Sequence, residues 1–155
     1  MPRKLGEALA RRNELQTRVV EIRDRLRISA LVQEGDSPPE DPQPLLRELD
    51  EVASELERLI ASINRTNSRA HLASGMTLTQ GLARRDVLGL LHGSLKAVAD
   101  ATAQQQARYS RSEIRLVRTF DVGAIRARLD QLARERRELD IEIQTANWTV
   151  DLEED

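Results

Sequence analysis

The sequence contains no cysteine and very few aromatic residues, and both shortages restrict what the chain can do. Without cysteine there is no disulfide, no thiolate nucleophile and no thiolate metal ligand. The chain has one tryptophan, one tyrosine and one phenylalanine. A core must therefore be built from Leu, Ile, Val and Ala, which suits helix seams better than sheets.

Long apolar runs and a large net charge are also missing. No run of about 18 apolar residues occurs, and no apolar stretch follows the first residues, so neither a membrane span nor an export signal is expected. The net charge of −2 argues against a nucleic-acid coat or a polybasic membrane anchor. We expect a cytoplasmic protein with one helical domain over residues 1–155.

What the sequence does contain is aliphatic residues at alternating three- and four-residue spacing, the pattern of helices that pack by narrow seams. One run is Leu5, Ala8, Leu15, Val19, Ile22 and Leu26, with Arg12 interrupting it. A second is Leu45, Leu49, Val52, Leu56, Leu59 and Ile63. A third is Val122, Ile125, Leu129, Leu132, Leu139 and Ile143, with Arg136 at one polar seam position.

Turn and capping residues divide the chain between these runs. Pro38-Pro39 stops the first helix, while Asp41-Pro42 and Asp121 are suited to begin later ones. The predicted elements are helices over 3–32, 42–64, 79–106 and 122–146, a loop over 34–44, and non-helical segments over 64–79 and 107–120. Within those segments, 70–72, 76–78 and the end of 107–120 are predicted to form a small β hairpin or strand element.

The helix predicted over 79–106 differs from the other three. Its apolar residues spread over about half its circumference, an arc wider than a two-helix seam requires. They are Val87, Leu88, Leu90, Leu91, Leu95, Ala97, Val98 and Ala101. Gly89 and Gly93 on the same helix predict close approach of a neighbour. This helix is therefore expected to be central or to touch another subunit.

Charge alternates in sign along the chain, from +4 over 1–33 to −7 over 34–63, +6 over 64–120 and −5 over 121–155. Antiparallel neighbours can therefore attract each other through their flanks. Together with the seams, this pattern predicts an all-α fold, a coiled-coil-rich antiparallel four-helix bundle with a small β element.

No pattern for catalysis or for a cofactor is present. A di-iron bundle needs Glu-x-x-His pairs, yet neither His71 nor His92 has a glutamate three residues before it. Ser94 and Ser110 lie in no nucleophile motif, and no glycine-rich phosphate loop occurs. We therefore predict a protein that is not an enzyme, with no catalytic residue, no metal and no cofactor.

One cluster has the chemistry to bind an anion. It consists of four arginines and two serines, namely Arg108, Arg111, Arg115, Arg118, Ser110 and Ser112. Guanidinium groups and hydroxyls hold phosphate oxygens well, and Tyr109 offers a stacking surface. Acidic segments on both sides supply intrachain partners for the same arginines. Structural salt bridges and anion binding therefore remain two open interpretations.

Several short motifs resemble a family of small bacterial helical proteins of unknown function that carry a septicolysin label. The motifs are Glu34-Gly35 with Pro39-Glu40-Asp41-Pro42, Ile63-Asn64-Arg65-Thr66-Asn67, Arg85-Asp86-Val87-Leu88, Arg108-Tyr109-Ser110-Arg111-Ser112-Glu113-Ile114 and Ala146-Asn147-Trp148-Thr149. The resemblance implies a helical fold, and it carries over no activity, cofactor or catalytic residue.

These observations favour a non-enzymatic structural or interaction protein that self-associates as a homo-oligomer through helical seams. One alternative is an RNA- or phosphate-binding module that uses the arginines of 108–118. A weaker alternative, implied by the septicolysin label, is a membrane-active protein of the cytolysin kind. A small-molecule ligand is not indicated by any motif.

Overall fold

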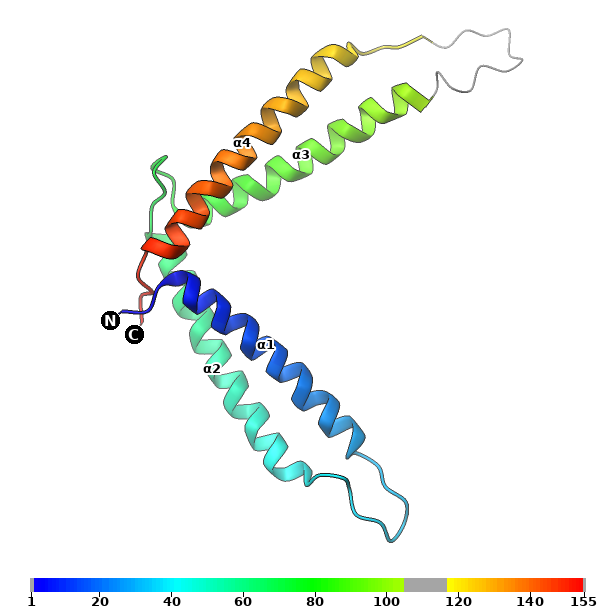
Figure 1. Cartoon of the computed structure of the whole chain (residues 1–155), viewed down its shortest axis with the longest axis vertical. Coiled ribbons are helices and arrows are strands. Elements are labelled where there is room, and N and C mark those ends of the chain that lie inside the picture. The colour runs from blue at the N-terminus through cyan, green and yellow to red at the C-terminus, as the bar shows by residue number, and fades with distance from the viewer. Residues whose placement is uncertain (1, 105–116, 155) are drawn as a thin grey trace, which may run out of the picture. The chain divides into compact units, whose positions relative to one another are not determined.

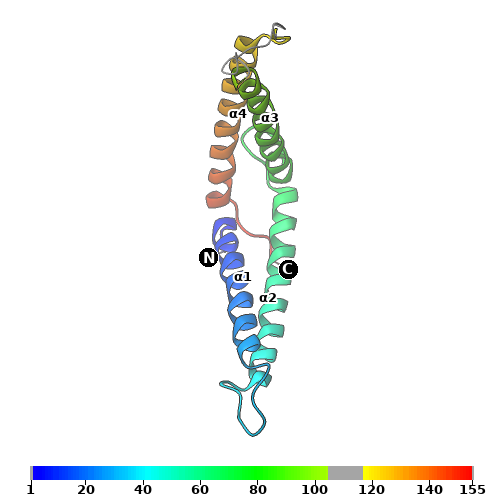
Figure 2. The same ribbon diagram turned by 90° about the vertical axis from the view of Figure 1, so that its right-hand side faces the viewer.

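The computed structural model describes residues 2–104 and 117–154, which are mostly helical. The helices are α1 (Leu5–Ile28), α2 (Pro42–Arg69), α3 (Leu78–Gln104) and α4 (Val122–Thr149). The chain divides into two compact units, a first unit of Met1–Ala70 with Ala146–Asp155 and a second unit of His71–Thr145. In the first unit α1 lies beside α2 (Figures 1 and 2), and in the second α3 lies beside α4 (Figure 1). The predicted all-α fold is confirmed, while the single domain over 1–155 stays a prediction.

The helix boundaries follow local capping. Asp41 Oδ1 accepts a hydrogen bond from Gln43 N at 2.9 Å, and Asp121 Oδ1 accepts one from Ala124 N at 3.2 Å, as expected for N-caps. The first helix ends at residue 28 rather than 32, whereas α2 and α4 continue five and three residues beyond their predicted ends at 64 and 146. The polar residues at the end of α2 had indicated a turn, but they remain helical, and Thr66 among them accepts a hydrogen bond from Glu153 N at 2.9 Å.

The α1–α2 hairpin buries the two predicted seams. The buried positions are Leu5, Ala8, Leu15 and Ile22 on α1, and Leu45, Leu59 and Ile63 on α2. The other predicted seam residues of both helices are half-buried. Arg12 is half-buried too, and its Nε atom is buried without a hydrogen-bond partner. Its aliphatic stem therefore occupies a seam position that the sequence had shown only as an interruption.

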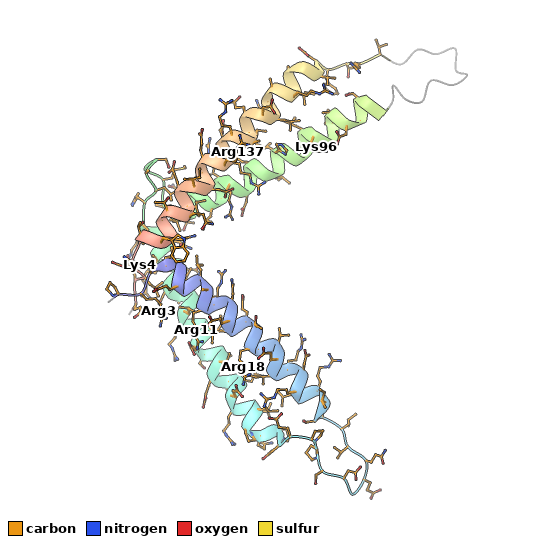
Figure 3. All side chains as sticks on the ribbon, in the orientation of Figure 1. Arg3, Lys4, Arg11, Arg18, Lys96 and Arg137 are labelled. Atoms are coloured by element: carbon orange, nitrogen blue, oxygen red, sulfur yellow. The ribbon has the colours of Figure 1, made fainter. Side chains whose placement is uncertain are left out.

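Ion pairs repeat along one flank of this hairpin. They join arginines of α1, spaced seven residues apart, to glutamates of α2 and of the loop before it; Arg11 and Arg18 are labelled in Figure 3. The arginine Nε atoms donate hydrogen bonds to these carboxylates, Arg11 to Glu55 at 2.9 Å, Arg18 to Glu48 at 2.7 Å and Arg25 to Glu40 at 3.0 Å. The hydrogen bond and charge of Arg25 lower the pKa of Glu40 below its ordinary 4.5. The predicted attraction between the basic first segment and the acidic second is thus present in this unit.

The end of the described chain closes the first unit. Leu5 N donates to Val150 O at 3.0 Å, and Lys4 Nζ lies 2.6 Å from Asp151 Oδ1. Glu153 N donates to Thr66 Oγ1 at 2.9 Å, and Thr66 is 1% exposed. Glu154 N also has a partner, Leu152 O at 3.2 Å, so the backbone of the last described residues is held in this unit.

In the second unit a tight turn precedes α3. Leu72 N donates to Met76 O at 2.8 Å, and Gly75 adopts a positive φ of 84° that favours glycine. His71 and Thr77 form an isolated β bridge. This bridge is all that the structure shows of the predicted hairpin, and residues 117–120 form no strand. Residues 107–116 lie outside the described part of the chain.

Candidate interaction surface

The face of α3 toward α4 is a seam of mixed residue types. Its positions, again spaced by three and four, are all buried or half-buried. They are Leu78, Gly81, Arg85, Leu88, His92, Leu95, Ala99 and Thr102, and they are called the inner stripe here. Leu132, Leu139 and Ile143 are the buried residues of α4 in this unit. The sequence had not predicted the inner stripe, because glycine, arginine and histidine, present at Gly81, Arg85 and His92, are not the residue types expected in an apolar seam.

Gly81 is where the second unit packs most closely. A Cβ atom at this position would collide with Leu72 Cδ1 and stand 3.7 Å from Leu139 Cδ1. Leu72 comes from the turn before α3 and is itself buried. The glycine therefore lets the turn, α3 and α4 meet at one point, which defines one end of the inner stripe.

A second stripe runs along α3 two residues out of phase with the first. At about 100° per residue, a shift of two residues leads to the opposite side of a helix. Its members, all exposed, are Ala83, Val87, Leu90, Ser94, Ala97 and Ala101, and they are called the outer stripe. Val87 is 53% exposed and Leu90 71%. The wide apolar arc predicted for this helix is thus divided between a packed face and an open one.

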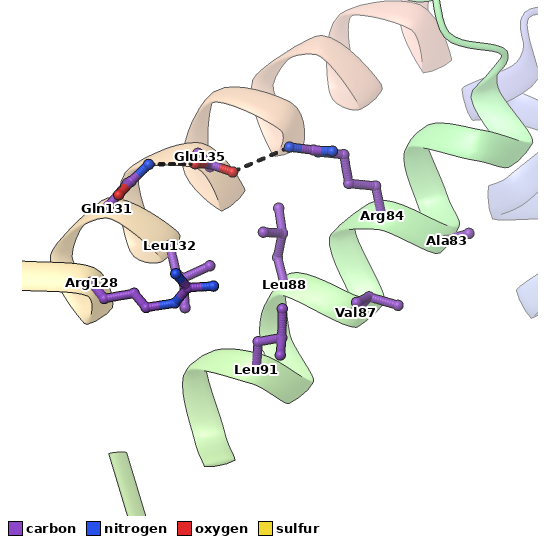
Figure 4. A pocket seen from close by; sticks show the side chains of 9 residues that line it. All are labelled: Ala83, Arg84, Val87, Leu88, Leu91, Arg128, Gln131, Leu132 and Glu135. Carbon is purple, nitrogen blue, oxygen red and sulfur yellow. Dashed lines mark hydrogen bonds and ion pairs between the residues drawn. The ribbon is translucent and has the colours of Figure 1, made fainter. Parts of the chain in front are cut away.

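A groove between α3 and α4 adjoins the outer stripe (Figure 4). Its volume is about 440 Å³. Leu88, Leu91 and Leu132 supply apolar lining, and Leu91 remains 41% exposed. At its edge Glu135 accepts hydrogen bonds from Arg84 at 3.3 Å and from Gln131 at 3.1 Å. The surface combines apolar side chains with a polar rim, the usual composition of a protein–protein contact.

The charged residues of α3 beside the outer stripe are matched within the chain. The ion pairs are Arg84 with Glu135 at 3.3 Å, Arg85 with Asp86 at 3.1 Å, and Lys96 with Asp100 at 2.7 Å. Exposed pairs of this kind contribute little to stability. They do mean that Arg84, Arg85 and Lys96 already have acidic partners within the chain, which makes these three less available to a nucleic acid.

Another hollow in the second unit gathers basic side chains around His92. Its volume is about 270 Å³, and its lining includes Arg136, Arg137 and Asp140. Arg136, predicted as a polar seam position, is exposed. Its guanidinium lies across Gly89, where a Cβ atom would stand 3.4 Å from Arg136 Nη1. Gly89 thus accommodates a neighbour in its own chain, whereas a Cβ at Gly93 would meet nothing within 4 Å.

Most of the predicted anion cluster lies outside the described residues. This applies to Arg108, Ser110, Arg111, Ser112 and Arg115, whereas Arg118 is described and is exposed. Anion binding by these residues stays a prediction.

The two histidines are not brought together with other metal-ligating groups. His71 is exposed in the turn before α3, and His92 is half-buried in the inner stripe. Over 2–104 and 117–154 no three His, Cys, Asp or Glu side chains are grouped so that they could hold a metal ion. The expectation of a chain without metal, cofactor or catalytic residue stays a prediction.

Comparisons with other proteins place the chain among relatives without known activity. A family model described as a family of unknown function (DUF6847) matches residues 12–152. A crystal structure of a functionally unknown conserved protein from Corynebacterium diphtheriae is 42% identical, with a TM-score of 0.87 over 99% of this chain and 100% of the other. No functionally curated protein matches. Both similarities support a family of unknown function, and neither supports the septicolysin label.

Proposed function

The chain belongs to the DUF6847 family of unknown function, and we propose that it is a non-enzymatic interaction protein that self-associates through the outer stripe of α3. The observation that carries the proposal is the exposure of Val87, Leu90 and Leu91 on one side of a helix whose opposite side is already packed. Burying a large aliphatic side chain contributes about 1.5–3 kcal/mol. A partner that covered these three residues would therefore gain appreciable stability.

The other functions considered from the sequence gain no support from the described residues. The arginines of an RNA- or phosphate-binding site lie mostly outside them. For a membrane-active protein, no helix in the described ranges is both long enough and apolar enough to cross a bilayer.

The proposal is tested by measuring mass in solution with light scattering over a range of concentrations, for the native chain and for two variants. Leu90→Glu places a charge in the outer stripe. Ile141→Glu is its matched control, because Ile141 is an aliphatic residue of α4 in the same unit and is 67% exposed, close to the 71% of Leu90.

We expect the native chain and Ile141→Glu to dimerise with the same dissociation constant. The dissociation constant of the Leu90→Glu dimer should be at least about tenfold higher, a loss of about 1.4 kcal/mol in the free energy of dimerisation. Circular dichroism checks that both variants keep their helix content. A native chain that stays monomeric at all concentrations would overturn the proposal, and so would equal weakening by both substitutions.

A further inference from the structure

The outer stripe is divided by size along its length. Its first half carries Ala83 and the large residues Val87 and Leu90, and its second half carries only small residues, Ser94, Ala97 and Ala101. From residue 83 to residue 101 the stripe covers about 27 Å at 1.5 Å per residue. A partner helix fits this face best when it presents small side chains to Val87 and Leu90 and large side chains to Ser94 and Ala97.

We infer that this partner is α3 of a second copy of the chain, lying antiparallel, with Leu90 opposite the partner's Ser94 and Val87 opposite the partner's Ala97. This inference rests on the proposed function and specifies how the two copies meet. Ala83 and the partner's Ala101 then face each other at both ends of the contact. The arrangement has twofold symmetry, so both copies contribute the same surface.

The antiparallel direction follows from the sizes of the side chains. In a parallel pair, Leu90 would face the partner's Leu90, and these two large side chains would hold the helices apart. Ala97 would then face the partner's Ala97 across a gap. Well-packed interfaces place large residues against small ones and leave no such voids. Only the antiparallel direction matches the large half of one stripe with the small half of the other at constant helix separation.

The register follows from the length of the stripe. When the twofold axis crosses α3 at the level of residue 92, each of the six outer-stripe residues faces another member of the stripe on the partner. Moving the axis by half a heptad toward the N-terminus would set Val87 against Leu90. Ala97 and Ala101 would then face Gln80 and Met76, and Met76 precedes α3, which begins at Leu78. The centred register therefore uses the whole face.

The surroundings of the axis are compatible with a second helix at close range. Leu91 and Gly93 flank residue 92; Leu91 is exposed and adds apolar area, while a Cβ at Gly93 would meet nothing within 4 Å. Asp86 comes near the partner's Asp100 in this register. Each of these carboxylates has a basic partner on its own helix, namely Arg85 at 3.1 Å and Lys96 at 2.7 Å.

The absence of cysteine makes a direct test possible, because each introduced thiol is then the only one in its chain. The experiment uses the full-length variants Val87→Cys, Leu90→Cys, Ser94→Cys and Ala97→Cys, singly and mixed in pairs. One member of each pair carries an affinity tag, so that mixed and like dimers separate on a gel. Oxidation in a thiol buffer then reports which positions lie within disulfide reach, about 7 Å between Cα atoms.

We expect Val87→Cys with Ala97→Cys, and Leu90→Cys with Ser94→Cys, to give about tenfold more mixed dimer than either variant gives alone. Like dimers of all four variants without enrichment of the mixed ones would show a parallel pair. That result overturns this inference and leaves self-association intact. Preferential coupling of Val87→Cys with Leu90→Cys would likewise overturn the register.

The mass of the native chain separates the remaining outcomes. If no mixture forms a cross-link while the native chain is dimeric by light scattering, the inference is overturned. Self-association then uses another face, and the assignment of the contact to the outer stripe in the proposed function is overturned with it. No cross-link with a native chain that is monomeric overturns the proposed function as well.

Discussion

The two helical hairpins share the three- and four-residue spacing of their apolar residues but differ in how much of that pattern is packed. In the first unit each helix has one seam, the flank is joined by arginine–glutamate pairs, and the chain after α4 closes the end of the hairpin. In the second unit α3 has two stripes, and α4 covers one of them. Exposed apolar residues of the first unit, such as Val20 and Leu46, do not form a continuous stripe at seam spacing. Seam spacing on both sides of α3 is therefore the feature that separates the proposed interaction face from scattered surface exposure.

The largest expected effect separates buried seams from the outer stripe. Ile22→Ala in the first unit and Leu132→Ala in the second should each lower the free energy of unfolding by about 2–5 kcal/mol, because both leave a cavity in a packed seam. Leu90→Ala should change it by less than about 0.5 kcal/mol in dilute protein, as is usual for surface sites. Urea unfolding measures all three. Equal losses for Leu90 and Leu132 would mean that the outer stripe is part of the fold.

A smaller effect concerns glycines with different surroundings. A Cβ at Gly6 would stand 3.0 Å from the backbone carbonyl oxygen of Asn147, whereas Gly93 has open space. Gly6→Ala should therefore destabilise the first unit by about 1–3 kcal/mol through overpacking. Gly93→Ala should stabilise α3 by up to about 1 kcal/mol, since alanine is the better helix former.

This pair is best measured by thermal unfolding in the Leu90→Glu background, so that self-association does not contribute. If both substitutions stabilised the protein, the close approach of Asn147 to α1 would be contradicted.

The smallest expected effect is the acid sensitivity of the first hairpin. Arg25 lowers the pKa of Glu40 in the folded state. The ion pair therefore stabilises the fold above the ordinary pKa of 4.5, and its contribution is lost as the pH falls through the lowered value. We expect the difference in melting temperature between the native chain and Glu40→Gln to be present at pH 6 and to shrink below pH 4.5. A difference that does not depend on pH would show that the pair contributes nothing.

The sequence predicts the seams of α1, α2 and α4, because their positions are filled mostly by Leu, Ile and Val, whose spacing is visible without a structure. It does not predict the inner stripe of α3. Burial of Gly81 depends on Leu72 from the preceding turn, and Arg85 and His92 are only half-buried. A search for three- and four-residue spacing that tolerated glycine, arginine and histidine would have found the inner stripe as far as Ala99.

The contacts after α4 were also beyond prediction. Leu152 is a single buried aliphatic residue in an acidic segment, and its backbone N–H donates to Arg3 O at 2.8 Å. Such pairing between distant segments has no periodic pattern in the sequence. The stable end of α2 has the same origin, because Thr66 accepts its hydrogen bond from Glu153, far along the chain.

The division of the chain also has a consequence for the order of folding. The second unit, His71–Thr145, is inserted between two segments of the first. If the first unit had to close with that insertion unfolded, Thr66 and Glu153 would be joined across a long flexible loop, and loop closure costs more entropy as the loop lengthens. Once the second unit is folded, Ser74 N lies 3.0 Å from Glu142 Oε2, so the insertion acts as a short connection. The hairpin that carries the proposed interaction face thus lowers the entropic barrier to closing the other, and folding of the first unit is expected to depend on the second.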